Sequence, residues 1–185
     1  MPPKYFVNDM SPKGERVYSE EASYILTDML SDPSARNITF GDFFNQKLPF
    51  KVALKTGTST NYRDGWIVGY TPQHTIAIWA GNFNGQTTVG MSGAQATGPI
   101  LIDILNELYP NGFSSLFPKP EGVVSSEVCS YSGMKPNNFC PHIKRELFIN
   151  GMEPEEICNY HNSSGGIHNL PPQFATWLHG RYKKG

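Results

Sequence analysis

Hydrophobic residues recur at helical spacing in the first part of the chain and at strand spacing further along. The helical set is Ala22, Ile25, Leu26, Met29 and Leu30, which fall on one face of a helix. Ser19 stands before this set as a candidate N-cap, and the two glutamates after it suit the positive end of a helix. The helix is expected to end near Asp32, because Pro33 disfavours helical geometry in the residue before it. A short helical turn is expected at residues 41–45.

From Phe50 the pattern changes to a period of two. Val52, Leu54 and Thr56 alternate with Lys51, Ala53 and Lys55. Two apolar runs follow at residues 66–70 and 75–80. We therefore expect a three-stranded antiparallel meander over residues 51–82. Residues 82–98 are rich in Gly, Asn, Ser and Thr and are expected to form a loop, after which a second amphipathic helix has Pro99 in its first turn.

Apolar residues become sparse beyond the proline-rich stretch at residues 118–120. Residues 121–170 hold too few of them for an independent core without cross-links, so a small module with two or three short strands is expected there. The predicted class is α+β: an antiparallel sheet packed against helices in residues 1–118, and a loop-rich, cysteine-containing extension in residues 119–185. Phe43, Phe44, Trp66 and Trp79 are expected in the core.

Composition and charge exclude some partners. The 185 residues carry 15 basic and 16 acidic side chains, a formal net charge of −1, which gives no electrostatic reason to bind nucleic acid or an anionic bilayer. No apolar run approaches the roughly 20 residues that a membrane-spanning helix needs.

The most distinctive local feature is Lys55-Thr56-Gly57-Thr58-Ser59, at the end of a predicted strand. Lys55 supplies a cation, the threonines supply hydroxyl donors, and Gly57 lacks the side chain that would keep a substrate away from the backbone. An acyl substrate bearing a carboxylate can lie along such a strand as an added strand. An exposed strand with ordinary surface residues is the alternative interpretation.

The residues around this pentapeptide extend the pattern. They are Tyr62-Arg63-Asp64-Gly65-Trp66, Val68-Gly69-Tyr70-Thr71-Pro72, Ile78-Trp79-Ala80-Gly81-Asn82 and Ser92-Gly93-Ala94. Together these strings resemble the third-motif region of penicillin-binding protein transpeptidases, most of all class A bifunctional enzymes of the 1C type, over roughly residues 15–110. The resemblance implies part of the penicillin-binding fold and a peptidoglycan D,D-transpeptidase that also reacts with beta-lactams.

The same resemblance implies roles for the strand residues. Lys55, Thr56, Gly57 and Thr58 would form the catalytic strand, and Lys55, Thr56, Thr58 and Ser59 would contact substrate. Lys55 would hold the substrate carboxylate, and the backbone N–H of Thr58 would form half of the oxyanion hole. Arg63 and Asp64 either brace the adjoining turn or form a surface ion pair.

Two motifs of the family are absent from their expected place. Ser-x-x-Lys and Ser-x-Asn should precede Lys55, and residues 1–54 contain neither. Residues 132–135 and 59–61 match these patterns in the wrong order and are interpreted as coincidences. Acyl transfer needs a serine nucleophile and its base, so the chain alone is predicted to be inactive.

The resemblance therefore describes part of a cell-envelope enzyme that acts outside the cytoplasmic membrane and is anchored by an N-terminal helix not present here. The alternative is a noncatalytic module that binds peptidoglycan or a protein. A partial domain would expose sheet edges and apolar surface, so self-association by strand exchange is also expected.

The three cysteines lie in the last third of the chain. Cys129, Cys140, Cys158 and His161 belong to a stretch that resembles the cysteine-bearing extension following the transpeptidase domain. One disulfide with a third free thiol is the first interpretation for an envelope protein. Tetrahedral zinc held by the three thiols and the imidazole is the second, and free thiols the third. The sequence prediction assigns no cofactor and no metal.

Overall fold

The computed structural model describes residues 15–40, 44, 47–48, 50–88, 90–113, 116–164, 167–168 and 174. Its contacts divide the chain into two compact units, Met1–Pro118 and Lys119–Gly185. The predicted α+β class, with antiparallel sheets and few helices, is confirmed. Among the helices of the described residues, none is both long and apolar enough to cross a membrane.

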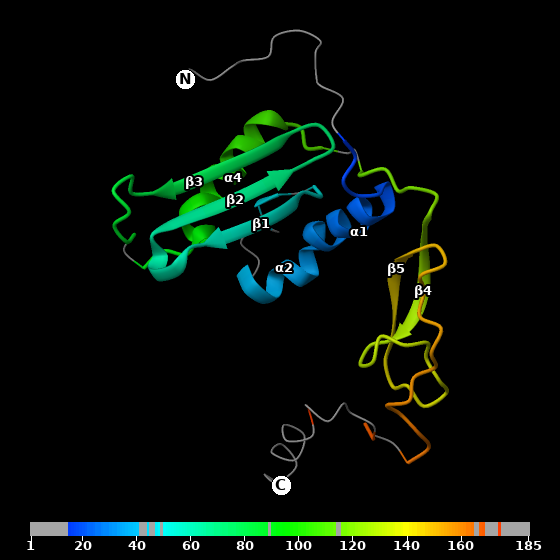
Figure 1. The fold of residues 1–185 in the computed structure, drawn as a ribbon. Helices are drawn as coiled ribbons and strands as arrows, with labels where there is room; N and C mark the ends of the chain where they lie inside the picture. The colour runs from blue at the N-terminus through cyan, green and yellow to red at the C-terminus, as the bar shows by residue number, and fades with distance from the viewer. Residues whose placement is uncertain are drawn as a thin grey trace. The chain divides into compact units, whose positions relative to one another are not determined.

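The first unit is built on a three-stranded sheet (Figure 1). Its strands are β1 (Ala53–Thr58), β2 (Asp64–Tyr70) and β3 (Thr75–Gly81), paired antiparallel in the order β1-β2-β3. The meander predicted over residues 51–82 is thus confirmed. The alternation from residue 50 onward arises because Leu54 and Ile67 are buried while Lys55 and Val68, one position along each strand, are exposed.

The first helix, α1, spans Glu20–Ser31 as predicted, and the hydroxyl of Ser19 accepts a hydrogen bond from the N–H of Ala22 at 3.1 Å. A second helix, α2 (Pro33–Phe40), follows where no helix was expected. Asp32 ends α1 and also caps α2, because its carboxylate accepts from the N–H of Ser34 at 2.8 Å. Proline at a first helical position costs no hydrogen bond, which is why Pro33 starts a helix here as well as stopping one. The turn expected at residues 41–45 lies largely outside the described residues.

The last helix of this unit, α4, spans Gly93–Leu108. The prediction of a loop up to residue 98 was therefore wrong, and Pro99 lies inside the helix rather than in its first turn. The earlier start is stabilised by a capping box, in which the side chains of Ser92 and Gln95 each accept from the other's backbone N–H.

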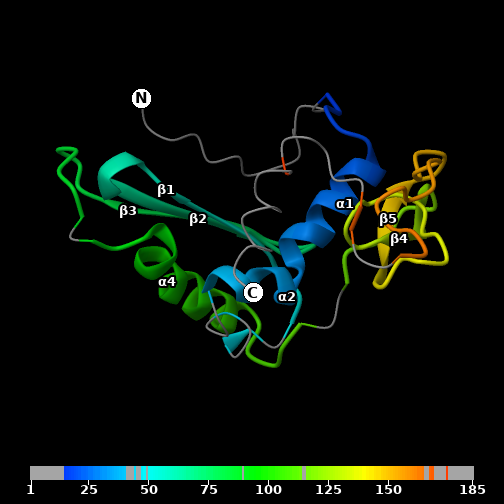
Figure 2. The same ribbon diagram turned by 90° about the horizontal axis from the view of Figure 1, so that it is seen from below.

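Helix α4 lies against one face of the sheet, whereas α1 and α2 lie along the β1 side (Figures 1 and 2). The sheet, α4 and the segment after α2 enclose the hydrophobic core: Phe44, Leu48, Val52, Leu54, Ile67, Leu101, Ile102, Leu105 and Tyr109. The predicted burial of Phe44 is confirmed, and Phe43 lies outside the described residues. Trp66 was expected in the core, but 47% of it is exposed, because its side chain projects from the sheet face opposite α4.

The second unit contains one antiparallel pair, β4 (Val123–Cys129) and β5 (Ile143–Ile149). A later segment returns beside the connecting loop through an isolated bridge between Lys135 and Ile157. Apart from Cys129 and Cys158, the buried hydrophobic residues of the described part of this unit are Val123 and Val128.

Candidate functional site

The Lys-Thr-Gly segment lies on β1, an outer strand of the sheet within the described residues. Lys55, Gly57 and Thr58 are exposed, and Thr56 is half-buried. An outer strand leaves one row of backbone N–H and C=O groups without a sheet neighbour. This segment is therefore accessible both through its side chains and through its backbone.

The strand pleat divides the segment between two faces. Thr56 and Thr58 share the face of α4, where the Thr58 hydroxyl accepts a hydrogen bond from the N–H of Gly93 at 2.8 Å. Lys55 and Gly57 lie on the other face, opposite Val68 and Trp66 of β2. The side chains of the segment therefore do not form one continuous face. A ligand can contact both pairs of residues only along the outer edge of β1.

Glycine at two positions lets α4 begin directly against this strand. A Cβ at Gly93 would overlap the carbonyl oxygen of Gly57, and a Cβ at Gly65 would come within 2.6 Å of the Gly93 Cα. The N-terminus of α4 therefore positions the strand at Gly57 and Thr58. Sequence reasoning missed this role of Gly93, although the Ser92–Gln95 capping box was a usable signal.

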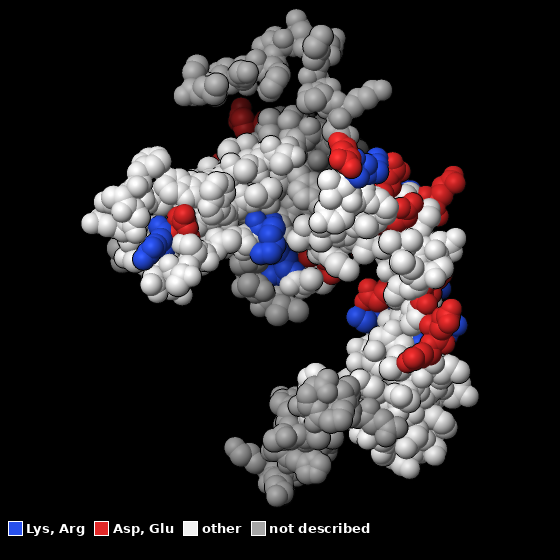
Figure 3. All heavy atoms as spheres, in the orientation of Figure 1, with Lys and Arg blue, Asp and Glu red and all other residues white. Residues whose placement is uncertain are grey.

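A hollow of about 300 Å³ lies beside the first half of the segment, between β1 and the two first helices. Lys55, Thr56 and Arg36 are among its lining residues, and basic side chains lie between β1 and α2 on this face (Figure 3). The Lys55 ammonium donates to the Thr56 carbonyl at 2.6 Å. Arg36 donates to the Val52 carbonyl at 3.2 Å, its Nε is buried without a hydrogen-bond partner among the described residues, and burial lowers its pKa.

The turn after β1 is held by Ser59, Asp64 and Trp79. The Ser59 hydroxyl accepts from the N–H of Asp64 at 3.0 Å, and the indole N–H of Trp79 donates to the Asp64 carboxylate at 3.0 Å. Hydrogen bonds from Ser59 and then from Trp79 lower the pKa of Asp64. No ion pair between Arg63 and Asp64 is found in the described part of the chain, so Asp64 braces the turn through these hydrogen bonds instead. The hydroxyl of Ser59, expected at the substrate, is thus engaged within the turn.

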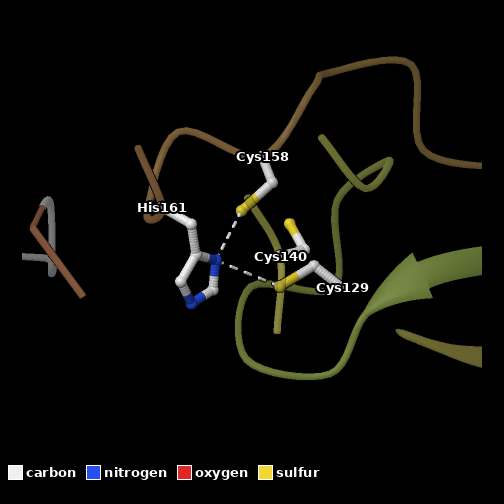
Figure 4. A group of neighbouring side chains, drawn as sticks. All are labelled: Cys129, Cys140, Cys158 and His161. Carbon is white, nitrogen blue, oxygen red and sulfur yellow. Dashed lines mark hydrogen bonds between the residues drawn. The ribbon is translucent and has the colours of Figure 1, made fainter. Parts of the chain in front are cut away.

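Four potential metal ligands converge in the second unit (Figure 4). The sulfur atoms of Cys129, Cys140 and Cys158 and a ring nitrogen of His161 all lie within 4.8 Å of one another. Nδ1 of His161 is 3.4 Å from the Cys158 sulfur and 3.6 Å from the Cys129 sulfur. Cys129, Cys158 and His161 are buried, and all three cysteines are free.

Polar groups around these four residues hold their segments together. The side-chain amide of Asn137 donates to the carbonyls of Cys158 and His161 at 2.7 and 2.9 Å, and its backbone N–H donates to the Cys140 sulfur at 3.3 Å. Burial raises the pKa of Cys129, but hydrogen bonds from the backbone of Ser132 and Tyr131 outweigh it and bring the pKa to about 7. Burial raises the pKa of Cys140 to about 11. The thiols therefore occupy chemically different environments within one cluster.

Known proteins resemble both units. The family described as "Penicillin-binding protein 1A, C-terminal domain" matches residues 119–163. Penicillin-binding protein 1A of Clostridium perfringens is 32% identical over 163 residues, which are 83% of this chain and 19% of the relative. Penicillin-binding protein 1C of Escherichia coli is 28% identical over 131 residues, 69% of this chain and 16% of the relative.

A solved structure shares the fold. The crystal structure of penicillin-binding protein 1A from Haemophilus influenzae aligns with a TM-score of 0.62 and 19% identity, over 77% of this chain and 22% of that one. The chain spans about a fifth of the length of the relatives that it matches. The resemblance predicted from the sequence is confirmed at the level of the family, and 1A relatives align with higher identity than the 1C relative does.

Proposed function

Because the chain belongs to the class A penicillin-binding protein family, we propose that its first unit forms one wall of a peptidoglycan D,D-transpeptidase cleft. The observation that carries the proposal is the exposure of Lys55, Gly57 and Thr58 on an outer strand, with a hollow alongside. A stem peptide, or a beta-lactam that resembles it, would lie along this edge as an additional strand.

The strand geometry supports distinct roles for its residues. Lys55 lies beside the hollow, where its ammonium would attract the substrate carboxylate. The N–H of Ser59 donates to the Asp64 carbonyl of β2, and in an antiparallel pair every second residue of a strand bonds to its partner. The backbone groups of Thr56 and Thr58 therefore point to the free edge, where the Lys55 ammonium donates to the Thr56 carbonyl. The Thr58 N–H would donate to the oxyanion of an acyl-transfer intermediate. The Thr58 hydroxyl accepts from Gly93 and keeps its own hydrogen for the substrate.

The serine nucleophile of the reaction would come from another part of a longer protein. The Ser132 hydroxyl accepts from the N–H of Met134 at 3.2 Å within a turn, and no helix aims it together with Lys135. Asn61, the last residue of the out-of-order Ser-x-Asn match, lies in a short 3-10 turn with a positive φ of 60°. The chain alone would therefore bind without turnover, and the longer protein would cross-link stem peptides at the outer face of the cytoplasmic membrane.

The test uses the chain together with the residues encoded upstream in the same reading frame. Fluorescent penicillin should acylate this longer protein, and Lys55→Ala should slow acylation by about 100-fold, as expected for loss of one preorganised charge-stabilising group. Lys144→Ala, which removes an exposed lysine of β5, is the matched control and should leave acylation unchanged.

Two results would contradict the proposal. Equal acylation of Lys55→Ala and the parent would remove the proposed role of the strand and favour a noncatalytic peptidoglycan- or protein-binding module. Covalent labelling of a serine in the 185-residue chain alone would refute the missing nucleophile.

We also propose that the chain self-associates through its sheet. Trp66 and Val68 expose 47% and 37% of their surface on one sheet face, and β3 is an outer strand of the described sheet as well. Such edges and faces favour strand exchange between copies. Light scattering should show a mean mass that rises with concentration, and a strict monomer at high concentration would exclude the exchange.

A further inference from the structure

We propose that Cys129, Cys140, Cys158 and His161 form a closed, structural Zn²⁺ site. Three thiolates and one imidazole are a donor set that tetrahedral zinc takes in structural sites. Their four ligand atoms already lie within 4.8 Å of one another. Zinc–sulfur bonds of about 2.3 Å place the sulfurs of a tetrahedron about 3.8 Å apart, so a contraction of only about 1 Å closes the site.

The convergence of all four groups favours a metal over a disulfide. A disulfide would join two sulfurs and leave the third sulfur and the imidazole without a role. In the structure, Nδ1 of His161 faces both Cys129 and Cys158 at hydrogen-bond range for sulfur, and Cys140 completes the group (Figure 4). The four donors come from the end of β4, which supplies Cys129, the loop before β5, which supplies Cys140, and the returning segment, which supplies Cys158 and His161 three residues apart.

Polar contacts hold the sulfur atoms and the imidazole in place. The backbone N–H of Asn137 donates to the Cys140 sulfur at 3.3 Å. Hydrogen bonds of this kind orient metal ligands in protein sites. Nε2 of His161 is buried without a hydrogen-bond partner among the described residues. Nδ1 is the ring nitrogen that faces the sulfurs of Cys129 and Cys158, so it is the atom positioned to bind the metal.

The site supplies what the second unit lacks. Its buried apolar residues outside the ligand set are Val123 and Val128 within the described residues. Units with so small a core generally depend on a metal or disulfides for stability. Four protein ligands leave no open position for substrate, so the role is structural rather than catalytic. Asn137 acts as a positioning residue, because it binds the carbonyls of two ligand residues.

The experiment measures metal in the full 185-residue chain purified with Zn²⁺ and without chelator. Mass spectrometry of the metal content should give about one zinc per chain. Replacement by Co²⁺ should give the intense absorption of tetrahedral cobalt together with thiolate-to-cobalt charge-transfer bands. This spectrum reports the donor set in the unaltered protein, so it does not depend on whether any variant folds.

Variants then assign the ligands. His161→Ala should weaken zinc binding by at least about 100-fold, since loss of a group that merely orients a ligand costs 10- to 100-fold. His161→Cys should restore binding with a cobalt spectrum shifted toward four sulfur ligands. His142→Ala is the matched control, because this histidine lies in the same unit but is not one of the four grouped ligands.

Three results would overturn the site. One is a metal-free chain with a single reactive thiol in the absence of reductant, which means a disulfide. Another is a metal-free chain with three reactive thiols. The last is zinc that remains bound with unchanged affinity when Cys129, Cys140 and Cys158 are replaced by serine.

Discussion

The interiors of the two units of this chain are stabilised in different ways. In the first unit, nine buried residues from the sheet, α4 and the segment after α2 form one hydrophobic core. In the second, the buried residues within the described part are two valines, two cysteines and a histidine, and the partly buried Cys140 joins the last three in one cluster. Hydrophobic stabilisation scales with buried apolar area, so the second unit depends on cross-linking chemistry to a degree that the first does not.

This difference in interior also affects how the loops of each unit are held in place. The first unit orders its loops by packing, for example where the Tyr109 hydroxyl lies 2.8 Å from that of Thr71 and 2.6 Å from Nδ1 of His74. Within the described residues, the second unit has one pair of strands, and the loop before β5 and the segment at residues 157–161 meet at the cysteine cluster and at Asn137. Perturbations that act on metal binding and perturbations that act on packing should therefore affect different units.

Removal of the metal by a strong chelator should have the largest effect and should be confined to the second unit. Structural zinc contributes about 10–16 kcal/mol of apparent binding free energy in small metal-dependent domains. Amide hydrogen exchange should show loss of protection in β4 and β5, while β1, β2 and β3 keep theirs. Equal loss in both units, or none in the second, would contradict the comparison.

Leu101→Ala should have the converse effect. Leu101 is fully buried in α4, and such a truncation lowers the free energy of unfolding by about 2–5 kcal/mol. Urea denaturation followed by the fluorescence of Trp66 and Trp79 should report this loss, with zinc content unchanged. Ile104→Ala on the same helix is the control: Ile104 is 37% exposed, so its loss should cost much less.

Gly93→Ala tests the contact that places α4 against the Lys-Thr-Gly strand. Alanine is favoured over glycine within helices, but here its Cβ would overlap the Gly57 carbonyl, so the substitution should cost about 1–3 kcal/mol. Gly57→Ala is the matched control, because its Cβ would meet only the Trp66 Cβ at an ordinary 3.6 Å. Urea denaturation should separate the two variants; a Gly93→Ala chain as stable as the parent would mean that α4 shifts freely.

Much of the first unit follows from sequence because its elements obey local rules. The meander has a period of two, and Ser19 caps α1 as its hydroxyl predicts. The errors in the predicted helices arose where the same type of residue is compatible with either a helix or a loop. Pro33 was interpreted only as a helix stop, and the small residues before Pro99 only as a loop, although a cap and a close glycine contact make them helical.

The site was less predictable than the fold because it depends on residues far apart in sequence. The pentapeptide identified β1, but its division between two faces required the register with β2 and the contact with Gly93. The spacing of the cysteines is irregular, so the sequence left disulfide, zinc and free thiols open. Only the antiparallel pairing of β4 with β5 and the return of residues 157–161 bring the four donors together.

The smallest expected effect concerns the turn after β1, and its sign is fixed by the pKa of Asp64. Hydrogen bonds from Ser59 and Trp79 lower this pKa from its usual 3.8, so the folded state favours the carboxylate. The stabilisation is therefore present above the unfolded-state pKa and is lost as the pH falls through the folded-state pKa. Asp64→Asn, which keeps the shape but not the charge, should be less stable than the parent at neutral pH.

That deficit should shrink as the pH falls below about 4, because the unfolded parent takes up its proton there and the folded parent does so at a lower pH. Unfolding by urea at pH 7 and at pH 3 measures it directly, and Asp103→Asn on the exposed side of α4 controls for the loss of one negative charge. A deficit of the same size at both pH values would show that the charge of Asp64 does not stabilise the turn. Zinc content should be the same in all three proteins, since Asp64 and Asp103 belong to the first unit and the four grouped ligands belong to the second.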